Sequence, residues 1–222
     1  MARVTAHLVG MFKINIHLFT AEGPEAVRKI GALGPGVFLD LKYHDIPNTV
    51  AGAISAAARL GEVRLLDVHA SGGAPMMRAA TEALAQHGGN SKLLGITILT
   101  SLDHPELRRV GFKGTPGAAA LSLARLAKKS GLDGVVASPK EVKRIRRACG
   151  RDFLIVVPGI RPAQTGARKA PRSSADDQAR IATPAEAIRA GADYLVIGRP
   201  ITAAPDPAAA AQAIAQEVAA AL

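Results

Sequence analysis

Three charged residues interrupt or closely follow an apolar run that predicts a buried strand. Asp40 and Lys42 lie at the end of the run 37–42, VFLDLK, and Asp45 follows three residues later. Isolated charges are costly to bury, so each needs a partner or a chemical task. Asp40 and Lys42 are two residues apart and therefore project from the same face of a strand. An ammonium group between carboxylates keeps its proton, so the cluster suits proton donation better than Schiff-base chemistry, which needs an uncharged amine.

The elements that must position this cluster alternate between strands and helices. Nearly continuous apolar runs predict strands buried on both faces. Capping boxes that begin at Ser138 and Thr183, each followed by proline, predict helix starts, and Gly61, Gly131 and Gly191 predict helix ends. The predicted strands span residues 11–15, 37–42, 63–70, 93–100, 134–138, 153–159 and 194–198.

This alternation predicts a parallel sheet, most simply a (β/α)₈ TIM barrel in one catalytic domain over residues 1–222. No linker or shift of composition divides the chain. The pattern contains seven strands where a closed barrel has eight, and the first begins at residue 11. We therefore expect a barrel that lacks its first strand and most of its first helix.

Polar residues gather where the predicted strands end, which in such a barrel is the active-site face. His69 lies there, and we interpret it as a histidine of the barrel core, because no further His, Cys or carboxylate completes the spacing of a metal site. Gly72-Gly73 is too short for a dinucleotide loop, so no cofactor site is predicted. The other polar residues at these ends are Lys13, Asp40, Lys42, Asp67, Thr100, the segment 158–161, Gly198 and Arg199.

The composition disfavours several classes of protein, among them nucleic-acid-binding and membrane proteins. The 222 residues have a formal net charge of +10, but the basic residues are spread over helices without interleaved aromatic residues. A solvated basic surface is therefore favoured over nucleic-acid binding, and a field that attracts an anionic small substrate is a third interpretation. The one cysteine, Cys149, can form no internal disulfide, which fits the cytoplasm. No apolar run reaches the roughly 18 residues of a membrane helix.

The motif DxKxxDIPNT, residues 40–49, is more specific than the charged triplet alone. It occurs with DVHASGG (67–73), ILTS (98–101), VPGIRP (157–162) and VIGRPIT (196–202). In this order the motifs resemble the orotidine 5′-monophosphate decarboxylase family, from about residue 8 to the C-terminus. The resemblance implies an enzyme of pyrimidine biosynthesis that converts orotidine monophosphate to UMP without metal or cofactor.

The resemblance also implies roles for single residues. Lys42 matches the lysine that protonates the C6 carbanion, Asp40 the carboxylate placed against the substrate carboxylate, and Lys13 the lysine that holds Asp40 and the ribose. Residues that reach across a homodimer interface into the neighbouring site match Asp45, Ile46 and Thr49. The contacts to the pyrimidine, the phosphate and the loop that closes on it match Thr100, Pro158, Arg161, Gln178, Gly198 and Arg199.

Two departures and two alternatives accompany this resemblance. The segment from Arg161 to Gln178 is longer and more basic than the family's loop, and the aspartate of the family's first strand has no counterpart. A related sugar-phosphate decarboxylase or aldolase of the same fold also uses a DxKxxD-like motif. A non-catalytic barrel that binds phosphate or RNA would suit the pI of about 10.3. DIPNT, PGIRP and the pair Thr100 and Gln178 favour the pyrimidine nucleotide.

Overall fold

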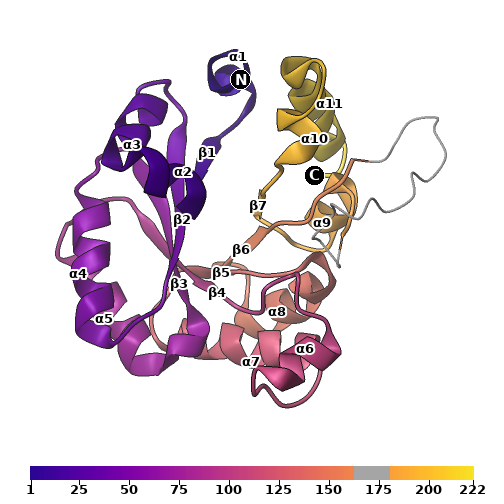
Figure 1. Cartoon of the computed structure of the whole chain (residues 1–222). Coiled ribbons are helices and arrows are strands. Elements are labelled where there is room, and N and C mark those ends of the chain that lie inside the picture. The colour runs from indigo at the N-terminus through magenta and orange to yellow at the C-terminus, as the bar shows by residue number, and fades with distance from the viewer. Residues whose placement is uncertain (163–180) are drawn as a thin grey trace. The chain divides into compact units, whose positions relative to one another are not determined.

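The structure, a computed structural model, describes residues 1–162 and 181–222 (Figure 1). Its strands form a sheet in the order of the sequence, and each pair with a resolved register is parallel. The seven predicted strands are confirmed, although the third to the seventh end one to four residues early. The strands are β1 (Met11–Asn15), β2 (Gly36–Tyr43), β3 (Val63–His69), β4 (Lys92–Ile96), β5 (Gly134–Val136), β6 (Leu154–Val157) and β7 (Tyr194–Leu195).

The chain divides into two compact units. Unit 1 comprises residues 1–97 and 123–135, and unit 2 comprises residues 98–122 and 136–222. Their boundaries fall within helix α7 (Pro116–Lys129) and within β5. The assignment of residues 1–222 to a single catalytic domain stays a prediction.

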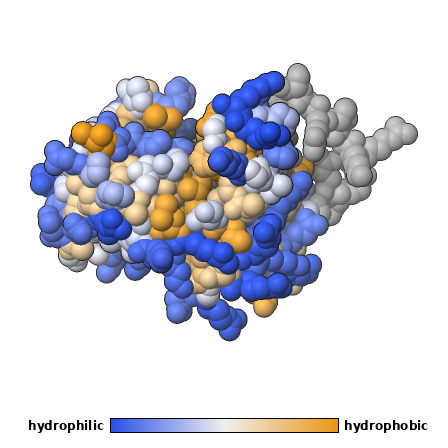
Figure 2. Space-filling model, turned by 90° about the horizontal axis from the view of Figure 1, so that it is seen from below, coloured by the Kyte–Doolittle hydropathy of each residue, from blue (hydrophilic) through white to orange (hydrophobic). Residues whose placement is uncertain are grey.

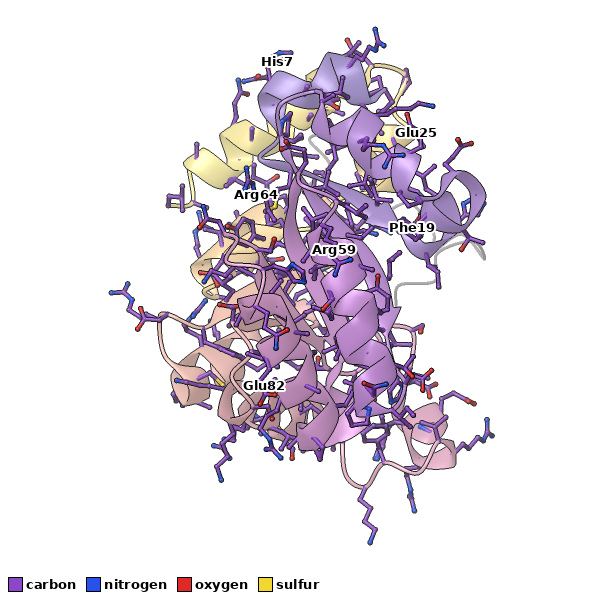
Figure 3. All side chains as sticks on the ribbon, turned by 90° about the vertical axis from the view of Figure 1, so that its left-hand side faces the viewer. His7, Phe19, Glu25, Arg59, Arg64 and Glu82 are labelled. Carbon is purple, nitrogen blue, oxygen red and sulfur yellow. The ribbon has the colours of Figure 1, made fainter. Side chains whose placement is uncertain are left out.

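In unit 1, helices cover the strands that carry the charged cluster. Helix α3 (Pro24–Gly31) packs against β1 and β2, and α4 (Pro47–Ala58) packs against β3 and against α5 (Gly73–Ala85) (Figure 1). The helix faces turned to the strands are apolar, whereas the charged residues Glu25, Arg59 and Glu82, labelled in Figure 3, are exposed. This division of apolar and charged faces is the one expected of helices that cover a buried parallel sheet. The short elements of this unit are α1 (Ala2–Thr5), η1 (Ala6–Leu8), α2 (Ile16–Glu22) and η2 (Ala70–Gly72).

Two helices of unit 2 begin at the capping boxes that the sequence predicts. Both predicted capping boxes form, Ser138 with Glu141 and Thr183 with Glu186, and Asp206 caps α11 through the N–H of Ala209. Helix α11 packs against α9 and α10 (Figure 1). The bounds are α6 (His104–Arg109), η3 (Pro139–Glu141), α8 (Val142–Cys149), α9 (Pro184–Arg189), α10 (Arg199–Thr202) and α11 (Pro207–Ala219).

Hydrophilic residues are spread widely over the surface seen in Figure 2. Cys149 is buried in α8. None of the helices in the described part of the chain is both long and apolar enough to cross a membrane.

An aspartate just before a strand fixes that strand to its neighbour in each unit. In unit 1 the N–H of Asp133 donates to the carbonyl of Leu93 at 3.0 Å, and its Oδ2 accepts the N–H of Leu93 at 2.8 Å. In unit 2 Asp193 makes the same two bonds with Ile155, at 3.0 and 2.6 Å. Each side chain thus closes the ladder at the strand's start and sets its register.

Arg146 connects the end of α8 to the start of β7. Its Nη1 donates to the carbonyls of Gly150, Arg151 and Phe153 at 2.7, 3.0 and 2.7 Å. Its Nη2 donates to the Gly191 carbonyl at 2.8 Å and to Asp193 at 2.5 Å. The side chain is 18% exposed, and its bonds to Phe153 and Gly191 are partly buried. The planar guanidinium can serve several acceptors at once, which a lysine cannot.

We expect Arg146→Lys to lower the free energy of unfolding by about 1–3 kcal/mol, because the partly buried carbonyls of Phe153 and Gly191 lose a donor. Urea unfolding measures the change. Arg147→Lys, on the exposed side of the same helix, is the control and should change stability by less than about 0.5 kcal/mol. Equal stability of the two variants would contradict the role given to Arg146.

Candidate active site

Two neighbouring strands of unit 1 bring Lys13, Asp40 and Lys42 together. Lys13 of β1 pairs in register with Phe38, which lies two residues before Asp40 on the same face of β2. The Lys13 Nζ therefore reaches Asp40 Oδ2 at 2.8 Å, and Lys42 Nζ forms an ion pair with Asp40 Oδ1. Asp40 is only 6% exposed. The structure thus brings these three residues together, with one carboxylate between two ammonium groups.

The backbone at Lys42 departs from the regular strand that the sequence predicted. Lys42 has a φ of 53°, and it is the one non-glycine residue with positive φ in the described ranges. The register of β2 on β3 shifts between Leu39 and Tyr43 at this point. The backbone N–H of Lys42 donates instead to Asp67 Oδ1 of β3 at 2.7 Å. An irregularity of this kind redirects a side chain at a strand end.

The surroundings of the cluster shift the pKa values of Asp40 and Asp67 in opposite directions. Burial acts to raise the pKa of Asp40, but the hydrogen bond with Asp67 and the charges of Lys13 and Lys42 outweigh it and hold the pKa at about 2. Asp40 thus stays ionised over the neutral range. For Asp67, burial and then repulsion by Asp40 raise the pKa well above its usual value. Two neighbouring carboxyls with opposite shifts share one proton between them.

His69 lies at the end of β3 with its ring centroid 5.3 Å from that of His44. Burial, then the charges of His44 and Lys42, lower the pKa of His69 to about 4, so the imidazole is neutral at neutral pH. This agrees with the predicted core histidine. Among the described residues, no group of three or more His, Cys, Asp or Glu side chains could hold a metal ion.

The residues predicted to serve a neighbouring subunit lie on the surface of unit 1. Asp45 and Ile46 are in the loop after β2, and Thr49 is in the first turn of α4; all three are exposed, Ile46 to 67%. The Asp45 Oδ1 accepts the N–H of Ile46 at 2.6 Å. Within the described residues, Asp45 forms no ion pair with Lys13 or Lys42. Its predicted role across a dimer is a separate hypothesis.

The remaining predicted residues belong to unit 2. Thr100 is buried. Arg161 follows β6, where its N–H donates to the carbonyl of Ala182 at 2.9 Å and its Nη1 to that of Ile160 at 3.0 Å. Gln178 lies outside the described residues, as does most of the long basic segment. The other members of this group are Pro158, just after β6, and Gly198 and Arg199, which are exposed at the start of α10.

A model of the family described as "Orotidine 5'-phosphate decarboxylase / HUMPS family" matches residues 1–214. The chain belongs to this family. A family relative from Geotalea uraniireducens, named orotidine 5'-phosphate decarboxylase, is 54% identical over 220 residues, covering 98% of this chain and 88% of the relative. A relative of the same name from Anaeromyxobacter dehalogenans is 55% identical over 214 residues, with 96% and 89% covered.

Two solved structures are similar to this chain in fold. The crystal structure of orotidine 5'-phosphate decarboxylase from Lactobacillus acidophilus is 40% identical, with a TM-score of 0.79 over 93% of this chain and 85% of that one. An uncharacterised conserved protein from Geobacillus kaustophilus is 33% identical, also with a TM-score of 0.79, over 98% and 95%. The predicted α/β class with seven parallel strands is thus confirmed. The expectation of a missing first strand and helix stays a prediction.

Sequence reasoning identified Asp67 only as one polar residue at a strand end, and it missed the left-handed backbone of Lys42. The only available signal was a carboxylate in the otherwise apolar run LLDV, residues 65–68. The contact partner could not be read from the sequence, because it depends on how β2 and β3 align.

The lowered pKa of His69 predicts a loss of stability in mild acid. The unfolded chain takes up a proton near pH 6.5 and the folded chain only near pH 4, so stability falls as the pH drops from 6.5 towards 4. The free energy of unfolding of the wild type should therefore be lower at about pH 5 than at about pH 7.5. We expect His69→Gln to make this decrease smaller by about 1 kcal/mol, a figure reduced because the imidazole is partly exposed.

Urea unfolding at the two pH values measures this difference. His7→Gln is the matched control, because His7 is exposed on η1 (Figure 3). A wild-type pH dependence in the His69 variant would refute the assignment.

Proposed function

We propose that this chain decarboxylates orotidine 5′-monophosphate to UMP in pyrimidine biosynthesis. The observation that carries the proposal is membership of the family, with relatives named orotidine 5'-phosphate decarboxylase at 52–55% identity over nearly the whole chain. The ion pairs of Lys13 and Lys42 with the buried Asp40 support it, because fixed charges suit a reaction that develops charge. A cytoplasmic setting belongs to the same proposal, since the chain carries a single cysteine.

Lys42 is the proposed proton donor. The bond between C6 and the carboxyl carbon breaks, CO₂ leaves, and the electron pair stays on C6. That pair lies in the ring plane, where the π system cannot delocalise it, so a cation beside C6 is needed. The Lys42 ammonium supplies both the positive charge and the proton that C6 accepts. Solvent then returns a proton to the Lys42 amine, and no cofactor enters the balance.

Asp40 and Lys13 prepare the site for this step. Asp40 is ionised at neutral pH and pairs with both lysines, so it holds the Lys42 ammonium in one place. The substrate carboxylate is proposed to lie against Asp40, where repulsion between the two anions is relieved when CO₂ leaves, a contribution of debated size. Lys13 keeps Asp40 oriented and is proposed to contact the ribose.

Residues of unit 2 are proposed to bind the rest of the nucleotide. Arginine suits phosphate because its guanidinium binds two oxygens at once, and barrels often hold phosphate after their last strands. Binding energy from a phosphate distant from the reacting bond can position the ring. The proposed contacts are Arg161, Gln178, Gly198 and Arg199 for the phosphate, with Thr100 and Pro158 for the pyrimidine side.

We expect Lys42→Ala to lower kcat by roughly 10²–10⁴-fold, the usual cost of removing a positioned proton donor. UMP binding should persist, because the proposed phosphate contacts are untouched. Decarboxylation followed by ultraviolet absorbance and UMP titration by calorimetry separate the two effects. Lys140→Ala, an exposed lysine of η3, is the control. Near-normal turnover in the Lys42 variant would refute the assignment.

Two measurements distinguish the related sugar-phosphate enzyme. UMP, and not a pentose phosphate, should raise the melting temperature of the wild type by preferential binding to the folded state. Borohydride reduction in the presence of substrate should trap no adduct on Lys42, because no Schiff base forms. A trapped adduct or protection by pentose phosphate alone would favour the aldolase function. A steep salt dependence of binding to generic RNA would instead favour an RNA-binding role.

The active unit is proposed to be a homodimer in which Asp45, Ile46 and Thr49 reach the neighbouring site. These residues are exposed on one loop and helix start, and an exposed isoleucine beside a carboxylate suits a contact surface between subunits. In a symmetric dimer each chain would receive the partner's Asp45 and supply its own.

Mixing Asp45→Ala chains with Lys42→Ala chains should restore activity. In a mixed dimer one site carries both lesions and the other carries neither, so random exchange should recover about a quarter of wild-type activity. Subunit exchange is checked by mass-tagged chains in native mass spectrometry. Mixed dimers that form but stay inactive would show that each site is built from one chain.

A further inference from the structure

We propose that Asp67 is a positioning residue for the charged cluster: as an uncharged carboxylic acid it holds the backbone of Lys42 and leaves Asp40 as the cluster's only anion. The expected effect of Asp67 on kcat rests on the proposed function, whereas the geometry around Asp67 does not. Asp67 has no role in the mechanism given above.

The first argument is the backbone of Lys42. A left-handed conformation is unfavourable for a lysine, so neighbouring structure must stabilise it. At this point the ladder between β2 and β3 is interrupted, and the Lys42 N–H cannot use a regular ladder bond. Asp67 Oδ1 accepts that N–H at 2.7 Å. The bond therefore replaces the missing ladder bond and sets the direction in which the Lys42 side chain leaves the strand.

The second argument is the surroundings of the Asp67 carboxyl. Asp67 is 0% exposed, between the buried residues Leu66 and Val68 of β3, and it pairs in register with Leu94 of β4. Its Oδ2 is buried and has no hydrogen bond of good geometry within the described residues, although Asp40 is close enough to interact with it. A charged oxygen in such a place is costly, and a proton on Asp67 removes that cost.

The third argument is the charge of the whole cluster. Lys13 and Lys42 carry two positive charges, and Asp40, ionised with a pKa of about 2, carries one negative charge. A neutral Asp67 leaves this group with a net positive charge. An ionised Asp67 would cancel it and would offer the Lys42 ammonium a second anion. A net positive cluster attracts an anionic substrate, and a single anionic partner keeps the ammonium at one position.

An asparagine reproduces the shape of a protonated aspartic acid, with one acceptor oxygen and one donor group. Asp67→Asn should therefore keep kcat within about threefold of the wild type. Asp67→Leu and Asp67→Ala remove the acceptor for the Lys42 N–H and should lower kcat by roughly a hundredfold. UMP affinity should change by less than about threefold in all three, because the phosphate contacts remain.

Val68→Ala is the control for general loosening of β3. Val68 is buried but projects from the opposite face of the strand, so this variant should lose stability while kcat per folded molecule stays near the wild-type value. The loss of kcat at constant UMP affinity, together with recovery by asparagine, separates positioning from a purely structural role.

Infrared spectroscopy of protein labelled with ¹³C-aspartate provides a readout that does not depend on turnover. The wild type at neutral pH should show the carbonyl band of a protonated aspartic acid, and Asp67→Asn should lack it. If the wild type fails to turn over orotidine monophosphate, the proposed function fails, but this band still decides whether Asp67 is protonated.

The opposite results would overturn the inference. Wild-type kcat in Asp67→Leu or Asp67→Ala would show that Asp67 positions nothing. An Asp67→Asn variant as slow as these two would show that the charge of Asp67 is required, and a wild type without the band would show that Asp67 is ionised. Should neither acceptor-free variant fold, the asparagine variant and the infrared band decide the question.

Discussion

The ion pairs of Asp40 with Lys13 and Lys42 are the interaction on which this structure's chemistry depends. Asp40 is almost fully buried, and a lone carboxylate there would be costly. Lysines from two adjacent strands compensate it. Because β1 and β2 pair in parallel with Lys13 opposite Phe38, Lys13 lies on the same face as Asp40, and a change of this register would separate the two side chains. The cluster therefore depends on the pairing of β1 with β2.

Asp67 extends this arrangement to a third strand. It accepts the N–H of Lys42 from β3 and lies close enough to Asp40 for the two carboxyls to titrate as a pair. Burial and then repulsion by Asp40 raise the pKa of Asp67, while the hydrogen bond with Asp67 and the two lysines keep the pKa of Asp40 low. Burial is also the main cause of the lowered pKa of His69, followed by the charges of His44 and Lys42. The cluster combines one fixed anion, two cations and uncharged neighbours.

Similar side-chain hydrogen bonds hold the starts of strands in place in both units. Asp133 and Asp193 each tie the start of a strand to the one before it, and Arg146 joins a helix end to a strand start. None of these residues lies in the proposed active site. They hold the strands in register, and register decides which side chains meet at the opposite ends.

The sequence by itself determined the α/β class, the seven strands and the family. Local patterns can be recognised in a sequence without knowing which segments contact one another. In this chain the local patterns are the apolar runs of strand length, the capping boxes at Ser138 and Thr183, and the motif 40–49. It also predicted that Asp40 and Lys42 would pair, because two residues on one strand face are neighbours in any register.

The tertiary structure alone decided the left-handed backbone of Lys42, the bond from its N–H to Asp67 and the opposite pKa shifts of the two aspartates. Asp67 lies 25 residues from Lys42 in the chain. Their contact arises where the register of two strands shifts, and that shift depends on packing between segments that no local pattern encodes. Protonation likewise depends on burial and on distances between charges, which exist only once the strands have paired.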